Sequence, residues 1–276
     1  MINQMKLSRG HFKKMINEKK LQKEFLEKGL IVKPVLAKKS LMWIKKKYIK
    51  IINQELKRMN KKVPKNFDIF NSVHKLIKSE EINDFRLKTF GEINKLKDFR
   101  KHYYEIAKPY LKILVGDELV MQKKVNLSIQ CPKDKSSLLP IHADTWDGDS
   151  PFEIVVRLPL VDCFKTKSMF MLPGNQNKIF NRIYKKNKND KFDIFKTLKN
   201  KLKWIDIKFG EVLIFNLCIP HGNIINNEKE TRWSMNCRFK NLFSPYADKK
   251  LGEFFSPIEL KPITKIGLNY KFPDEE

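Results

Sequence analysis

The chain has 276 residues, of which 41% are apolar, so it can bury the core of one large domain or of one domain with an attached subdomain. Its formal net charge of +26 would ordinarily indicate nucleic acid or an anionic membrane surface as a partner. However, 49 of the 57 basic residues are Lys, whereas recognition of phosphates and base edges relies on the bidentate Arg fork. The surplus also lies mostly in residues 1–115, with a net charge of +19 against +7 for residues 116–276. We therefore interpret the lysines mainly as solvated surface and do not expect nucleic acid as a partner.

The spacing of the cysteines and the length of the apolar segments indicate the cellular compartment. The cysteines form no CxxC pair, and their apolar, strand-like surroundings predict buried free thiols: Cys131, Cys163, Cys218 and Cys237. The sequence has no run of 18 apolar residues, and its first residues lack an apolar stretch of signal-peptide length. We expect a cytoplasmic protein without a membrane span.

Residues 1–115 are expected to form a helical region that packs on a sheet. In residues 41–59 apolar side chains recur every three or four positions, and Ser40 is placed to cap this amphipathic helix. A similar segment, residues 11–28, ends at Gly29, and a further helical stretch starts at Ser79 and runs toward Pro109.

From about residue 118 the pattern changes to short β-branched or aromatic segments separated by Pro, Gly and Asn, which is typical of strands. These segments are residues 118–132, 152–163, 167–174, 204–209, 211–218 and 231–243. They predict a closed or sandwiched β structure over residues 116–255, interrupted at 176–203 by two amphipathic helices, 179–188 and 192–202. Residues 256–276 contain three prolines and are expected to form an extended tail.

Two histidines and one aspartate are candidate metal ligands. In a strand, residues two apart point to the same face, so His142 and Asp144 can reach one ion. His221 follows a buried strand at residues 211–215, where a ligand can face a cavity. Each residue also has an ordinary alternative, because a His-x-Asp pair arises by chance and His221 could be a hydrogen-bonded loop histidine. Together they form the two-histidine, one-carboxylate set of non-haem Fe(II) oxygenases, which leaves other coordination positions open.

The segment after His221 supports this interpretation. Polar and apolar residues alternate strictly over residues 232–239, with Arg232, Ser234, Asn236 and Arg238 on one face. An arginine that points into a core needs an anionic partner. A dicarboxylate cosubstrate would be such a partner.

The ordered set HAD (142–144), LPLVDC…MFMLPG, GEVLIF…HG and R-x-S (232–234) resembles the phytanoyl-CoA hydroxylase-like branch of the 2-oxoglutarate- and Fe(II)-dependent oxygenases. More narrowly, HADTWDGDSPFEIVVRLPLVDCFKTKSMFMLP is similar to oxygenases of sporadically distributed carbohydrate gene clusters. The resemblance covers roughly residues 118–245.

The resemblance implies a mainly β fold, a double-stranded β-helix or jelly-roll flanked by α-helices. It implies Fe(II) held by His142, Asp144 and His221, with 2-oxoglutarate and dioxygen at the remaining positions. Arg232, assisted by Ser234, would bind the far carboxylate of 2-oxoglutarate. Asn126 and Gln130 are candidates for the near carboxylate, with ordinary polar strand positions as the alternative.

The expected reaction is hydroxylation, or another oxidation, of a small polar substrate, which the subgroup resemblance indicates is a sugar or a nucleotide sugar. The retained aspartate ligand disfavours halogenation. Substrate candidates are Trp146, Asp147 and Asp149, which could instead form a simple turn, together with Arg238. Arg157 is either a substrate contact or an edge-strand residue that reaches solvent, and we favour the second.

Two other functions remain open. A jelly-roll without enzymatic activity could bind a partner through its basic helices, and a cupin-like metal enzyme could work without 2-oxoglutarate.

Overall fold

The computed structural model describes residues 16–174, 182–183, 185 and 191–273. Its α-helices are α1 (Glu18–Lys28), α2 (Lys38–Arg58), α3 (Ile69–Ser72), α4 (Ile82–Asn94), α5 (Phe99–Glu105), α6 (Lys108–Leu114), α8 (Lys191–Leu198) and α9 (Pro262–Asn269). Its strands are β1 (Leu30–Pro34), β2 (Leu119–Gln122), β3 (Asn126–Gln130), β4 (Glu153–Pro159), β5 (Phe170–Met171), β6 (Lys203–Trp204), β7 (Glu211–Asn216), β8 (His221–Gly222), β9 (Arg232–Asn241) and β10 (Phe255–Glu259).

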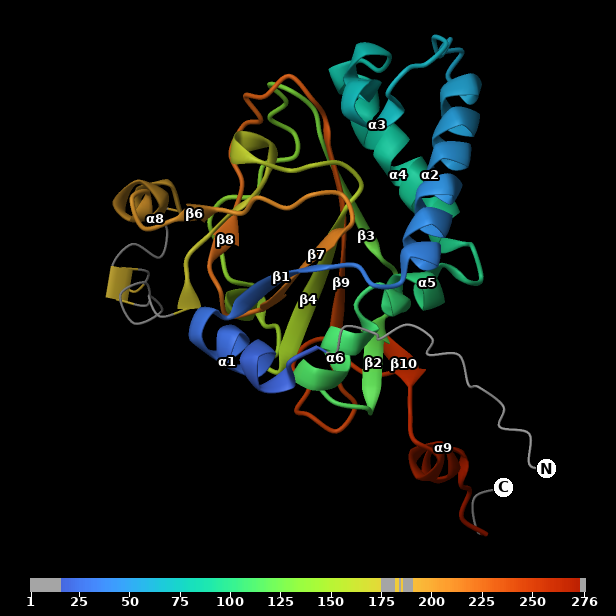
Figure 1. Ribbon diagram of the computed structural model, residues 1–276, viewed down its shortest axis with the longest axis vertical. Coiled ribbons are helices and arrows are strands. Elements are labelled where there is room, and N and C mark those ends of the chain that lie inside the picture. Colours follow the sequence, from blue (N-terminus) through green and yellow to red (C-terminus); the bar gives the residue numbers. More distant parts are fainter. Residues whose placement is uncertain (1–15, 175–181, 184, 186–190, 274–276) are drawn as a thin grey trace, which may run out of the picture.

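The described strands form two antiparallel sheets. The larger one has the order β1-β7-β4-β9-β2-β10, with β3 also paired to β9, and the smaller one has the order β6-β5-β8. The strand directions and the flanking helices are those of a double-stranded β-helix core, so the predicted fold class is confirmed (Figure 1).

β4 lies in the middle of the larger sheet, between β7 and β9. Its neighbour β9 is long because polar and apolar residues alternate without interruption, so one face packs into the core while the other faces the cavity described below. Trp233, Met235, Cys237 and Phe239 on the first face are fully buried.

The N-terminal region is not purely helical, contrary to the sequence-based expectation. Gly29 caps α1 with a φ of 71°, a conformation that favours glycine, and turns the chain directly into β1. β1 then pairs with β7 along its whole length, from Leu30 opposite Phe215 to Pro34 opposite Glu211. The first region therefore contributes one edge of the main sheet.

The periodicity of α2 is confirmed, but its predicted cap is wrong. The apolar positions Leu41, Ile44, Tyr48, Ile52 and Leu56 are buried, in one continuous core with α4, α5 and the larger sheet. The helix begins two residues before Ser40, whose hydroxyl instead forms a hydrogen bond with Nδ1 of His102 on α5 (3.0 Å). Figure 1 shows α2, α3 and α4 standing together on one side of the sheets.

The C-terminal segment is extended only in part. β10 pairs with β2, but residues 262–269 form α9, so an extended tail is the wrong prediction there. The prolines do not prevent a helix here, because Pro262 occupies the first turn of α9, where the N–H that proline lacks would have no partner within the helix.

The insert is also only partly described. The second predicted helix is present as α8, whose Ile194 and Leu198 pack on Phe170. The first, at 179–188, lies largely outside the described residues. No described helix is long and apolar enough to cross a membrane.

Candidate metal and cosubstrate site

The three candidate ligands meet between the two sheets. His142 and His221 form a backbone bridge, with N···O distances of 2.9 Å and 2.7 Å. One ligand atom from each of His142, Asp144 and His221 lies within 4.8 Å of the others, close enough to bind one ion. The premise of a strand was wrong, however, because Asp144 starts a 3-10 turn, Asp144–Asp147.

Backbone carbonyls orient both imidazole rings. Nδ1 of His142 donates to the carbonyl of Pro140 (2.8 Å), and Nδ1 of His221 donates to that of Ile219 (2.9 Å). Each ring therefore keeps its proton on Nδ1 and leaves the Nε2 lone pair for a metal. Burial, and then the neighbouring His142, lower the pKa of His221, which favours the neutral form that a metal ligand requires.

A chain of charged groups holds Asp144. Nη2 of Arg238 lies 3.1 Å from Oδ1 of Asp144, and Nη1 lies 2.7 Å from Oδ1 of Asp149. Asp149 is only 6% exposed and also forms an ion pair with Lys249. The structure thus places Arg238 and Asp149 behind the candidate ligand, with the Asp149 carboxylate engaged by two cations.

The ligands open into a cavity of about 250 Å³. Of the residues predicted for the site, Asn126, His142, Asp144, His221, Arg232 and Arg238 line it. Further lining residues that the sequence analysis did not assign to the site include Ser128, Arg157, Met169, Asn223 and Asn236.

Arg232 is the first residue of β9 and is buried, with 1% exposure. Its Nη1 donates to the carbonyl of Ser168 (3.1 Å) and its Nη2 to Oγ of Ser128 (3.1 Å), while Nε has no hydrogen-bond partner in the described chain. Among the described residues no carboxylate forms an ion pair with it. Burial, and then the charge of Arg157, lower its pKa to about 9. This guanidinium is a cation without an anion.

Arg157 belongs to the same cavity, so our preference for an edge-strand position was wrong. It lies on the central strand β4, and its Nη2 donates to Oγ of Ser234 (2.8 Å). Its Nη1 lies 3.0 Å from Sδ of Met169. A single charge inside the apolar run VVRLPL was the signal, because on a strand that is buried on both faces such a residue needs a polar cavity to face.

Four of the other predicted residues do not line the described cavity, whereas Asn126 does. Ser234 is buried beneath Arg157, and the amide of Gln130 donates to the carbonyl of Ile224 (2.7 Å), so neither lines the cavity in the described chain. Trp146 packs on the cluster around Phe170, and Asp147 is exposed at the turn. Asn126 does line the cavity, and its Nδ2 donates to Oδ1 of Asn236 on β9 (3.1 Å).

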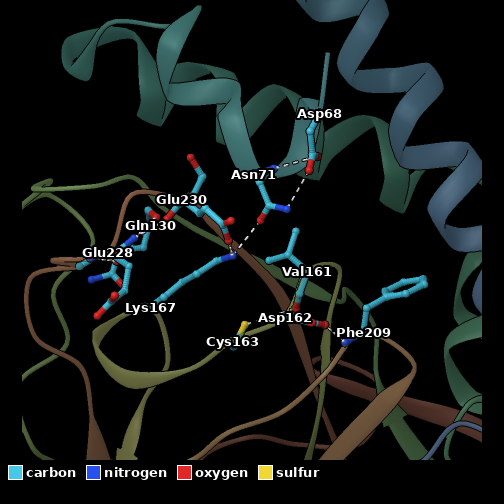
Figure 2. Close-up of polar contacts among 12 residues, drawn as sticks. Asp68, Asn71, Gln130, Val161, Asp162, Cys163, Lys167, Phe209, Glu228 and Glu230 are labelled. Carbon is cyan, nitrogen blue, oxygen red and sulfur yellow. Dashed lines mark hydrogen bonds and ion pairs between the residues drawn. The ribbon is translucent and has the colours of Figure 1, made fainter. Parts of the chain in front are cut away.

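An ion pair between a fully buried lysine and a half-exposed glutamate anchors the segment that carries Ser168 and Met169. Figure 2 shows Lys167 directed toward Glu230 and Asn71. Its Nζ lies 2.6 Å from Oε2 of Glu230 and 2.8 Å from Oδ1 of Asn71, which belongs to α3. The N-terminal helices are thereby connected to the wall of the cavity.

Comparison with known proteins gives structural matches alone, because no protein-family model and no curated protein matches the sequence. The chain is similar to ThoJ, a non-heme monooxygenase in complex with nickel, with a TM-score of 0.53 and 14% identity over 87% of this chain and 84% of that chain. It is also similar to AviO1 from Streptomyces viridochromogenes Tue57, with a TM-score of 0.52 and 13% identity over 84% of this chain and 99% of that chain. At such identities the likeness shows a shared fold.

Proposed function

We propose that the protein is an Fe(II)- and 2-oxoglutarate-dependent oxygenase. The observation that carries this proposal is a single cavity lined by two complementary groups. One is the converging set of His142, Asp144 and His221, and the other is the buried guanidinium of Arg232, with which no carboxylate of the described residues forms an ion pair.

The donor set fits ferrous iron. Two neutral imidazoles and one carboxylate leave open positions for a cosubstrate and dioxygen, which is the arrangement of non-haem iron oxygenases. Bound iron would supply the oxidative decarboxylation of 2-oxoglutarate to succinate and the oxidation of a substrate C–H bond. The presence of Asp144 disfavours halogenation, because this carboxylate would occupy the position that a halide needs.

The protein's own groups would fix the geometry of this site. The carbonyls of Pro140 and Ile219 set both ring orientations, and Arg238 sets that of Asp144. Arg232 would donate a pair of hydrogen bonds to the far carboxylate of 2-oxoglutarate, and its unpartnered Nε supports this assignment. Asn126 remains a candidate for the near carboxylate because it lines the cavity, whereas Gln130 is engaged with backbone.

The experiment is anaerobic addition of Fe(II) and 2-oxoglutarate, which should produce a visible metal-to-ligand charge-transfer band. We expect the band in the wild type, none in His221→Ala, and one that requires far more cosubstrate in Arg232→Ala. Arg100→Met is the matched control, since Arg100 donates to the carbonyls of Met121 and Ser256 and does not line the described cavity. Absence of the band in the wild type would contradict the proposal.

For the substrate, we propose a small polar molecule, with a sugar or nucleotide sugar as the first class to test. The modest cavity volume and its polar lining of amides and arginines support a small molecule. The test is succinate release from 2-oxoglutarate in the presence of a panel of nucleotide sugars. Release that no panel member stimulates above the uncoupled rate would contradict this class.

A further inference from the structure

Two arginines line the cavity into which the candidate ligands open, and the charge of Arg157 also reaches His221, whose pKa it helps to lower. Arg232 donates to Ser128 and Arg157 donates to Ser234, and these two serines face each other across the β3–β9 pair. Arg232 also donates to the carbonyl of Ser168, and Arg157 contacts Sδ of the next residue, Met169. The hydrogen-bond partners of the two guanidiniums are therefore neighbouring residues, and both arginines line the same cavity.

This arrangement brings like charges together without an anion. Neither arginine forms an ion pair with a carboxylate of the described residues, and both line the cavity. Burial lowers the pKa of Arg157, and burial followed by the charge of Arg157 lowers that of Arg232. Two desolvated cations close together are costly, and structures keep such pairs where a ligand compensates them.

The hydrogen-bond partners of Arg157 argue against a purely structural role for this residue. If Arg157 were a structural residue, its fork should be saturated by neighbouring acceptors, but one side faces a thioether, which is a weak acceptor. The other side faces a single serine hydroxyl. Most of its five N–H donors thus remain available to a ligand.

We propose that Arg157 is a second anchor of the cosubstrate, so that the far carboxylate of 2-oxoglutarate is held by Arg157 and Arg232 together. This inference rests on the proposed function. It gives Arg157 a positioning role, because two converging forks fix both the charge and the plane of one carboxylate. It also predicts strong selection for a dicarboxylic 2-oxo acid, since a ligand without the second carboxylate leaves both cations uncompensated.

The experiment compares two ligands of equal chain length. 2-Oxoglutarate and 2-oxopentanoate share the 2-oxo acid end, and only the first carries the far carboxylate. Each is titrated anaerobically into the Fe(II) protein, and the charge-transfer band gives a dissociation constant without turnover. The variants are Arg157→Met, which keeps the volume, and Arg157→Lys, which keeps the charge but loses the fork. Arg100→Met again serves as the control for the loss of an arginine elsewhere.

We expect Arg157→Met to raise the dissociation constant of 2-oxoglutarate by about 10- to 100-fold and to change that of 2-oxopentanoate by less than about threefold. Arg157→Lys should lie between the wild type and Arg157→Met. An equal effect on both acids would overturn the inference, because Arg157 would then act at the shared end, and so would no effect on either. If the wild type shows no band at all, the proposed function fails instead.

A second measurement separates anchoring from folding. The metal-free Arg157→Met protein should unfold at the same temperature as the wild type or a higher one, because it has lost a like-charge repulsion. Its stabilisation by 2-oxoglutarate with Zn(II) should be smaller than that of the wild type. If this variant does not fold, Arg157→Lys with the two acids decides the question, and unchanged discrimination there would overturn the inference.

Discussion

Arg238 contacts Asp144 and Asp149 at the same time, with its Nη2 3.1 Å from one carboxylate and its Nη1 2.7 Å from the other. Asp144 is the carboxylate in the candidate metal set, and Asp149 is buried behind it with Lys249. The ligand is therefore held by a fixed cation rather than by solvent, and its orientation does not depend on a bound ion.

Removing this cation should weaken metal binding. We expect Arg238→Met to lower the affinity for Ni(II) or Zn(II) by about 10- to 100-fold, because partners of a ligand set its orientation. Isothermal titration of the metal-free protein measures this effect. Arg86→Gln, on α4 and bonded to Asn83, is the control. Wild-type affinity in Arg238→Met would show that Asp144 is positioned by other groups.

Gly222 gives an independent test of the ligand geometry. A Cβ there would lie 2.7 Å from the carbonyl oxygen of Leu139 and 2.8 Å from Cζ of Phe170, so the backbone next to His221 must shift. Gly222→Ala should therefore lower both stability and Ni(II) affinity.

Gly91 of α4 is the matched control, because a Cβ there has open space. Gly91→Ala should raise the free energy of unfolding by about 0.5–1 kcal/mol, since alanine is favoured inside a helix. Urea denaturation of both variants checks the pair, and equal stability of Gly222→Ala and the wild type would contradict the expected clash.

In the Lys167–Glu230 ion pair of Figure 2 only the lysine is buried, so the two partners should differ in their effect on stability. Lys167 is fully buried, whereas Glu230 is about half exposed. Glu230→Gln removes the carboxylate charge, leaves the buried ammonium with neutral partners such as Asn71, and should destabilise the protein by about 2 kcal/mol. Lys167→Met removes the buried charge itself and should cost less. Chemical denaturation measures both, and a larger loss in Lys167→Met would contradict this interpretation.

Glu153 predicts a dependence of stability on pH. It is 1% exposed, and neither carboxylate oxygen has a hydrogen-bond partner in the described chain. Burial raises its pKa to about 7, although Arg238, Lys240 and Lys249 oppose the shift. Because the folded protein then holds this proton more tightly than the unfolded chain, stability is lost as the pH rises from about 4.5 to about 7.

Glu153→Gln should therefore stabilise the protein at pH 8, by about 3 kcal/mol, and should have little effect at pH 4.5. Urea denaturation at both pH values measures the difference. An equal effect of the substitution at pH 4.5 and pH 8 would show that the charge of Glu153 is not responsible.

Much of the architecture could be predicted from periodicity. The alternation of β9 and the spacing in α2 depend on local patterns, and both survive in the structure. β1 was missed because LIVKP is short and follows a helix, and its strand character comes from pairing with β7, 180 residues away in the chain. Non-local pairing of this kind leaves no local signal.

The candidate site could also be predicted only in part. The sequence pointed to His142, Asp144 and His221 because their chemistry is distinctive, and the fold brings their ligand atoms within 4.8 Å of one another. The sequence could not reveal that the carboxylate of Asp149, a candidate substrate contact, forms ion pairs with Arg238 and Lys249. Burial and ion pairing are properties of packing, and no spacing rule anticipates them.

β1 is an edge strand of the larger sheet and covers one side of β7. A fragment starting at residue 116 would lack the strand that satisfies the backbone of β7, and it would leave a row of open amides and carbonyls along that border. Other polypeptides could add to such a border, so we expect this fragment to aggregate. In the protein with β1 present, the five residues Leu30–Pro34 pair with β7 and so prevent this edge-to-edge association.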